Sequence, residues 1–150
     1  MQKQKQAFTM IEMVFVIVIL GILAAVAIPR FAATRTDAII AKGRADVASI
    51  RSAIVSERQT RFIKGDSKFI NKLHSSATSY FDGNGTAGIT LLMYGIKPKD
   101  ADGHWHGVTT VGGNPTYYFK IQGADNTFTY TQADGKFECT AGIYCSDLVD

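Results

Sequence analysis

The spacing of apolar and polar residues changes twice along the chain. Residues 8–28, FTMIEMVFVIVILGILAAVAI, are almost continuously apolar, and Glu12 is their single ionisable side chain. From Phe31 to about Arg61 apolar residues recur at intervals of three and four, which predicts an amphipathic helix. Beyond residue 104 the period becomes two, which predicts strands. The pattern therefore predicts one long helix, apolar in its first half, followed by a sheet.

The apolar run has the length of a membrane span. A helix over residues 8–28 rises about 1.5 Å per residue and extends about 32 Å, close to the thickness of roughly 30 Å of a bilayer's hydrocarbon core. Read as a secretory signal, the same run would instead end in a cleavage site at residues 25–27, Ala-Val-Ala, and release a soluble periplasmic protein. Three features oppose that alternative: the run is long for a signal, it contains an acid, and helical periodicity continues beyond it.

Glu12 is the sharpest feature of this run. A carboxylate at the centre of a membrane helix costs about 2.5–3.5 kcal/mol, and such a residue normally has a function and a partner. The alternative interpretation is an acid in the first helical turn that is stabilised by the helix dipole.

Gly21 and Pro29 are the two weak points of the predicted helix. Proline cannot donate a hydrogen bond to the helix ladder, and glycine costs about 1 kcal/mol relative to alanine. The segment between them is predicted to bend or melt locally, or else the proline produces a simple kink.

The first 30 residues resemble the type IV pilin-like family, which comprises type IV pilins, pseudopilins of type II secretion and competence pilins. The resemblance rests on a short basic leader, the order AFTMIE at residues 7–12, and an apolar helix with Gly21 and Pro29. It implies that prepilin peptidase cuts between Ala7 and Phe8 and methylates the new amine of Phe8. Ala7 stands where family members usually carry glycine.

The resemblance also implies an architecture. It is the α+β type IV pilin fold, in which a long N-terminal helix, half transmembrane and half amphipathic, packs on a C-terminal antiparallel sheet. The implied parts are a leader at residues 1–7, a transmembrane and assembly helix at 8–29, and a head at 30–150. The chain would cross the inner membrane once with its head in the periplasm, and then enter a pilus or pseudopilus.

The implied function is that of a structural subunit of a type IV pilus-like filament, a type II secretion pseudopilin or a pilin. Its partners would be copies of itself, other pilins, prepilin peptidase, the inner-membrane assembly machinery and the membrane. Cleavage creates a cationic amine on Phe8 at the depth of Glu12, and Glu12 of an axially shifted neighbour can neutralise it. The alternative is a minor or competence pilin that binds DNA or a secreted substrate.

The charges are segregated along the chain. Residues 30–64 hold eight basic and three acidic side chains, whereas residues 65–150 hold six basic and nine acidic ones. A basic stalk and an acidic head can attract one another between subunits, or the two charge groups are simply solvated faces. An acidic head does not favour nucleic-acid binding. The sequence has no catalytic motif, so we predict a non-enzyme.

The C-terminal part predicts an antiparallel meander packed on the long helix. Its expected strands are Trp105–Val111, Tyr117–Ile121, Thr127–Thr131 and Phe137–Thr140. Ser67 is predicted to cap a short helix that runs through Leu73, and residues 89–96 are ambiguous between strand and helix.

Cys139 and Cys145 are the only cysteines. Their spacing is too wide for a C-x-x-C redox or zinc pattern. A translocated head lies in an oxidising compartment, which predicts a disulfide between them; the alternative is two buried free thiols.

Two loops resemble parts of a calcium site. Asp82 and Asn84 in one loop, and Asp100 and Asp102 in another, place side-chain oxygens at alternate positions. Ordinary turn chemistry explains both loops. We therefore expect no metal and no cofactor, with calcium as the alternative.

Overall fold

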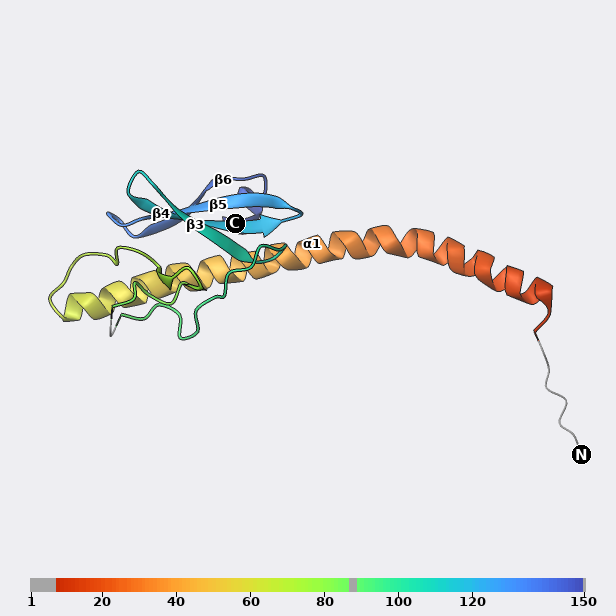
Figure 1. The fold of residues 1–150 in the computed structure, drawn as a ribbon, viewed down its shortest axis with the longest axis horizontal. Coiled ribbons are helices and arrows are strands. Elements are labelled where there is room, and N and C mark those ends of the chain that lie inside the picture. The colour runs from red at the N-terminus through yellow and green to blue at the C-terminus, as the bar shows by residue number, and fades with distance from the viewer. Residues whose placement is uncertain (1–7, 87–88, 150) are drawn as a thin grey trace, which may run out of the picture. The chain divides into compact units, whose positions relative to one another are not determined.

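The computed structural model describes residues 8–86 and 89–149, apart from the side chain of Ala32. Within these ranges the elements are α1 (Met10–Ile63), β1 (His74–Ser76), β2 (Ser79–Tyr80), β3 (Trp105–Val111), β4 (Asn114–Ile121), β5 (Ala124–Thr131), β6 (Lys136–Ala141) and α2 (Cys145–Val149) (Figure 1). The chain divides into two compact units, one ending at Arg35 and the other beginning at Thr36. A long N-terminal helix followed by an antiparallel sheet is the predicted α+β layout, which is confirmed.

The main sheet is an antiparallel meander in the order β3-β4-β5-β6, and β1 pairs with β2 in a separate small sheet. Two-residue turns join the first three strands of the meander: Gly112-Gly113 links β3 to β4, and Gln122-Gly123 links β4 to β5. All four turn residues have positive φ, as the tight turns that match strand twist require. The strands predicted at Tyr117–Ile121 and Thr127–Thr131 begin earlier than expected, because residues 114–116 and 124–126 already pair in the sheet.

The second unit is organised around one apolar face of α1. Val47, Ile50 and Ile54 point from the helix into the core and are almost fully buried. Their partners come mainly from the sheet, which lies along this part of α1 in Figure 1: Trp105, Tyr117, Phe119, Ile121, Phe128, Tyr130 and Phe137. Each fully buried large apolar side chain contributes about 1.5–3 kcal/mol. The predicted packing of helix on sheet follows from this spacing of three and four.

Polar contacts also join α1 to the residues that cover it. Arg51 donates a hydrogen bond from Nε to the carbonyl oxygen of Phe137 over 3.0 Å. Trp105 donates from Nε1 to a carboxylate oxygen of Asp46 over 3.1 Å. Burial raises the pKa of Asp46, and the hydrogen bond from Trp105 opposes that rise. These contacts fix the register of the helix against the sheet, beyond what apolar packing specifies.

The segment between α1 and β1 corrects one prediction. No helix forms from Ser67 to Leu73. Instead the backbone amide of Leu73 donates to the hydroxyl of Tyr117 over 3.0 Å, and the hydroxyl of Tyr130 donates to the carbonyl oxygen of Ile70 over 2.7 Å. The predicted short helix was wrong because side chains of the sheet bind backbone groups that a helix would need.

Residues 89–96 form no helix either. In the described part of the chain they are irregular up to Ile96, which pairs with Tyr80 in an isolated antiparallel bridge. The amide of Leu92 also donates to the carbonyl oxygen of Phe81 over 3.0 Å. The segment is therefore held by a few backbone contacts to residues 80–82 rather than by a continuous ladder.

Candidate functional site

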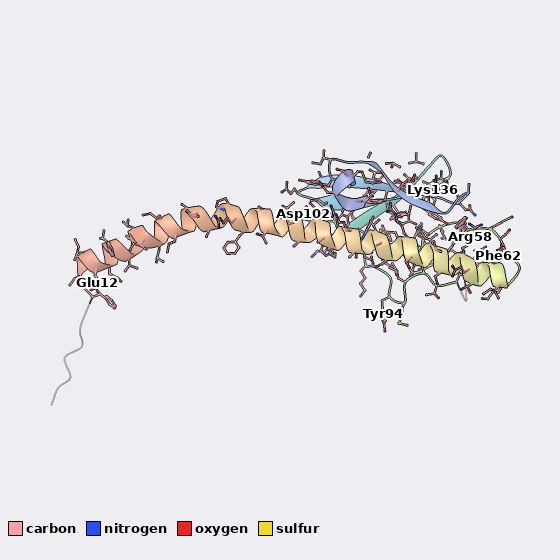
Figure 2. The ribbon with its side chains drawn as sticks, turned by 180° about the vertical axis from the view of Figure 1, so that it is seen from behind. Glu12, Arg58, Phe62, Tyr94, Asp102 and Lys136 are labelled. Carbon is pink, nitrogen blue, oxygen red and sulfur yellow. A yellow bond between two sulfur atoms is a disulfide. The ribbon has the colours of Figure 1, made fainter. Side chains whose placement is uncertain are left out.

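The candidate site begins where α1 begins (Figure 2). Glu12 lies in the first turn of the helix, and Thr9 immediately precedes the first helical residue. The amide of Glu12 donates to the hydroxyl oxygen of Thr9 over 3.3 Å, and the amide of Thr9 donates to Oε2 of Glu12 over 3.4 Å. This reciprocal pair is a capping box, which satisfies two backbone N–H groups that the start of a helix leaves unpaired.

The capping box gives Glu12 a local role that sequence reasoning missed. The signal was visible as Thr-x-x-Glu at the start of an apolar run. Both hydrogen bonds are long and exposed, and among the described residues none donates to Oε1 of Glu12. The carboxylate can therefore cap its own helix and still accept a partner. Phe8 is exposed next to it, whereas Ala7 lies outside the described residues.

The large apolar side chains in the first part of α1 are exposed to solvent among the described residues of the first unit. They are exposed over 40–88% of their surface between Met10 and Ile28. An 18-residue window of α1 has a mean hydropathy of 3.0, and none of that window is buried. A continuous exposed apolar surface of this kind indicates contact with lipid or with other subunits.

Gly21 and Pro29 both lie within α1, which is helical through both positions. A methyl group built on Gly21 would meet no other atom within 4 Å. Packing among the described residues therefore does not demand glycine here. The predicted role of these two residues in helix flexibility stays a prediction.

Cys139 and Cys145 form a disulfide with Cα atoms 5.5 Å apart. The bond ties β6 to α2, whose Leu148 is buried. A methyl group on Gly43 would lie 2.5 Å from Leu148 and 2.8 Å from Phe119. The disulfide thus helps to hold α2 in the position where Leu148 packs against α1 at Gly43.

The first pair of calcium candidates is engaged in loop hydrogen bonds. Asp82 accepts from the amide of Ser75 over 2.8 Å and also from its hydroxyl. These bonds lower the pKa of Asp82 in spite of its partial burial. Asn84 accepts from the amide of Thr86 and donates to Asn71, each over 3.0 Å. The loop shows the turn chemistry that the sequence also predicted.

The second pair of candidates lies beside the sheet. Asp100 forms an ion pair with Lys120, and a hydrogen bond from that ammonium group lowers the pKa of Asp100. Asp102 accepts a hydrogen bond from the amide of Gly123 over 2.8 Å. Among the described residues, no group of three or more histidine, cysteine, aspartate or glutamate side chains is placed to hold a metal ion.

These features define a class of protein in which an exposed apolar helix near the N-terminus is followed by an α+β unit that contains a disulfide. Residues 2–28 match the model of the prokaryotic N-terminal methylation motif, so the chain carries the N-terminal signature of the type IV pilin family. No curated protein and no solved structure matches the chain. The motif supports a pilin-like substrate of prepilin peptidase that is anchored in a membrane by its apolar helix.

Proposed function

We propose that this chain is a structural subunit of a type IV pilus-like filament, either a pseudopilin of type II secretion or a pilin. The observation that carries the proposal is the methylation motif at residues 2–28, combined with an apolar helix whose large side chains are exposed between Met10 and Ile28. A filament of parallel helices is an assembly that would bury such a surface. The role is structural and not enzymatic.

Processing comes first in this proposal. Prepilin peptidase cuts between Ala7 and Phe8 and methylates the amine of Phe8. The new amine is a cation with a reference pKa near 8. In the filament it would pair with Glu12 of a neighbouring subunit, which removes two unpaired charges from an apolar environment. The free oxygen of Glu12 is consistent with this pairing.

The head would lie outside the cytoplasm. The disulfide supports this orientation, because such bonds persist in the periplasm and at the cell surface but are rare in the cytosol. The leader would remain on the cytoplasmic side until it is cut.

Intact-mass measurement of the protein from native membranes tests the proposal. The expected mature chain begins at Phe8 and carries one additional methyl group on its amine. The matched measurement in cells that lack prepilin peptidase should return the uncut chain. A mature N-terminus at Ile28 would refute the proposal and establish a secretory signal with a soluble product.

A further inference from the structure

A cationic pocket of about 490 Å³ lies beside the last turns of α1, from which Arg58 projects (Figure 2). Its volume lies within the range of roughly 300–1,000 Å³ that is typical of ligand pockets. Four separate parts of the second unit line it: α1, the segment after α1, the start of β4 and the turn after β5. The described polar lining residues are Arg58, Ser67, Lys68, Asn114 and Gln132, and none of the described lining residues is acidic.

The two cations of this pocket are unpaired. Among the described residues, neither the guanidinium group of Arg58 nor the ammonium group of Lys68 forms a hydrogen bond or an ion pair, and both residues are exposed. Their N–H groups are therefore accessible to a ligand. Two positive charges without a carboxylate beside them in the lining produce a local potential that attracts anions.

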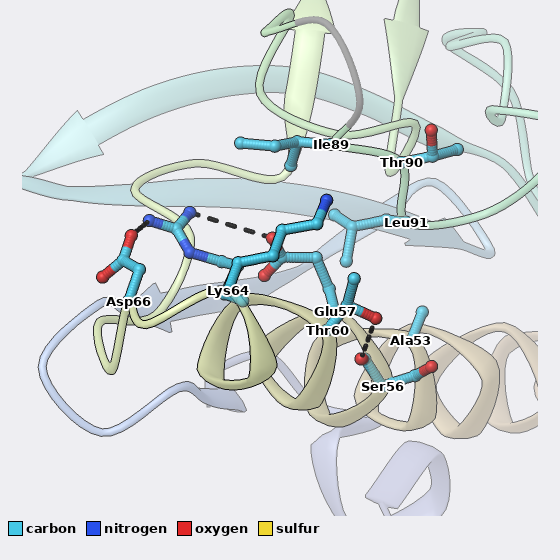
Figure 3. A pocket seen from close by; sticks show the side chains of 10 residues that line it. Ala53, Ser56, Glu57, Thr60, Lys64, Asp66, Ile89, Thr90 and Leu91 are labelled. Carbon is cyan, nitrogen blue, oxygen red and sulfur yellow. Dashed lines mark hydrogen bonds and ion pairs between the residues drawn. The ribbon is translucent and has the colours of Figure 1, made fainter.

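Three acidic residues are adjacent to lining residues in the sequence, and each of them is engaged elsewhere. Arg61 pairs with both Glu57 and Asp66 (Figure 3). Lys136 engages both carboxylate oxygens of Asp134, one through its backbone amide over 3.1 Å and the other through its ammonium group over 3.3 Å. These acids therefore do not neutralise the cations of the pocket by direct contact, and an anionic ligand meets no competing carboxylate there.

An aromatic ring holds the guanidinium group of Arg58 in place. The central carbon of this group lies 3.9 Å from the centroid of the Phe69 ring. Stacking of this kind leaves the N–H groups at the edge of the guanidinium plane free to bind. The ring itself is closely packed, because a methyl group built on Gly135 would lie 2.1 Å from it. A donor that is already oriented loses less entropy when a ligand binds.

Neutral polar groups complete the lining. Gln132 donates one N–H of its side-chain amide to the carbonyl oxygen of Phe69 over 3.5 Å, which leaves the second N–H for a ligand. The side-chain amide of Asn114 and the hydroxyl of Ser67 form no hydrogen bond among the described residues. Donors from four parts of the chain thus surround one volume.

We propose that this pocket binds the phosphate group of a small phosphorylated molecule. A phosphate monoester carries a charge of about −1.5 to −2 at pH 7 and has three acceptor oxygens, which matches two unpaired cations. The fork of Arg58 binds two of these oxygens side by side, and Lys68 binds the third. The remaining volume accepts the organic part of the ligand beside the amides of Asn114 and Gln132. A carboxylate fits less well, because its two oxygens lie in one plane.

The test uses the full chain in a nonionic detergent at low ionic strength. Calorimetry and phosphorus NMR measure the binding of glycerol 3-phosphate, with glycerol as its neutral counterpart and succinate as a carboxylate of similar charge. We expect saturable binding of glycerol 3-phosphate in the millimolar range or tighter, weaker binding of succinate, and no binding of glycerol. Affinity should fall as salt is raised from about 20 to about 200 mM, because salt screens exposed charges.

Three variants of the two cations and one matched control locate the site. Arg58→Gln and Lys68→Gln each remove one charge and should weaken binding about fivefold or more. Arg58→Lys keeps the charge but loses the planar fork, so its affinity should lie between those of wild type and Arg58→Gln. Arg35→Gln makes the same change at an exposed position of α1 that does not line the pocket, and should leave affinity unchanged. Fluorescence of the buried Trp105 establishes that each variant is folded.

Four outcomes would overturn the inference. Absence of saturable binding of glycerol 3-phosphate at low salt would mean that solvent and mobile counter-ions alone occupy the pocket. Binding of glycerol with the same affinity would show that the phosphate group is not recognised, and tighter binding of succinate would assign the pocket to carboxylates. Equal loss, or equal retention, of binding in Arg58→Gln and Arg35→Gln would place the ligand elsewhere. None of these results depends on filament assembly, so this inference and the proposed function succeed or fail separately.

Discussion

Glu12 has an observed role in the capping box and a proposed role in assembly, and one substitution can separate the two. The capping box requires an acceptor at the third helical position, and glutamine can supply it as well as glutamate. Charge pairing with the amine of Phe8 requires a carboxylate. Glu12→Gln therefore preserves the local hydrogen bonds with Thr9 and removes only the charge. Thr9→Ala is the converse variant, because it removes the cap and keeps the carboxylate.

The structure allows the two effects to be compared in size. Loss of a threonine cap costs about 1 kcal/mol, and loss of the favourable charge at the helix start costs about 0.3–1 kcal/mol. An amine buried in a filament without its carboxylate costs about 3–5 kcal/mol, which corresponds to roughly a 100-fold or larger loss in the association constant. Glu12→Gln should therefore act on assembly far more strongly than Thr9→Ala.

The assay is the partition of protein between sheared filaments and the inner membrane in cells that express one variant only. Glu12→Gln should be inserted and cut after Ala7, because the scissile bond is unchanged, and it should accumulate as processed monomer. Intact mass verifies the cut. Thr9→Ala should still assemble. Co-expressed with wild type, Glu12→Gln should enter filaments but be depleted in them.

Filaments of Glu12→Gln at wild-type yield would refute charge pairing, even for a chain that is a pilin. Failure of Thr9→Ala to assemble, with normal assembly of Glu12→Gln, would assign the function of this segment to the capping box instead. A mass that includes the leader would move the defect to processing. Each result thus points to one step.

Four further expectations concern the head, and thermal unfolding of the full chain in detergent, followed by the fluorescence of its single tryptophan, measures all of them. Gly43→Ala should destabilise it by about 1–3 kcal/mol, because the added methyl would lie 2.5 Å from Leu148; an unchanged melting temperature would contradict this packing. Reduction of the bond between Cys139 and Cys145 should cost about 2–2.5 kcal/mol for so short a loop, and no shift on reduction would show that it does not stabilise the head. Burial lowers the pKa of His74 below its ordinary value of 6.5, so the unfolded chain binds more protons and stability should fall as pH drops below 6.5; His74→Asn should reduce this dependence, and an identical pH profile would count against it. EDTA should leave the melting temperature unchanged, and a large drop reversed by calcium would assign a metal to the loops.

Much of the fold was predictable because it depends on local periodicity. The helical spacing of apolar residues predicted the buried face of α1, which includes Val47, Ile50 and Ile54. The alternation of apolar and polar residues in the C-terminal part predicted the strands of the meander. The segment from Ser67 to Leu73 was not predictable in this way. Its backbone groups bind hydroxyls of tyrosines more than forty residues later, and sequence spacing carries no trace of such contacts.

The candidate sites also differ in whether they depend on residues close in sequence or on contacts between distant residues. The methylation motif and the disulfide involve residues close in sequence, and both were visible as patterns. The surroundings of the ion pair between Glu57 and Arg61 were not visible in this way. Arg61 also pairs with Asp66, and Ile89, Thr90 and Leu91 approach the helix from a later segment. Such contacts depend on the tertiary structure and leave no pattern in the spacing of residues.

The charge segregation of the sequence also has a different meaning in the folded chain. Lys42, Arg44 and Arg51 lie on α1 and were candidates for attraction to the acidic head of a neighbouring subunit. Each instead donates to a backbone carbonyl oxygen of its own head: those of Gly103, Asp147 and Phe137. Donors engaged in this way gain less from a second partner, because a new contact must compensate for the bond that it weakens. In the proposed filament these three cations would therefore contribute little to attraction between subunits, and the exposed apolar part of α1 and the carboxylate of Glu12 would contribute more.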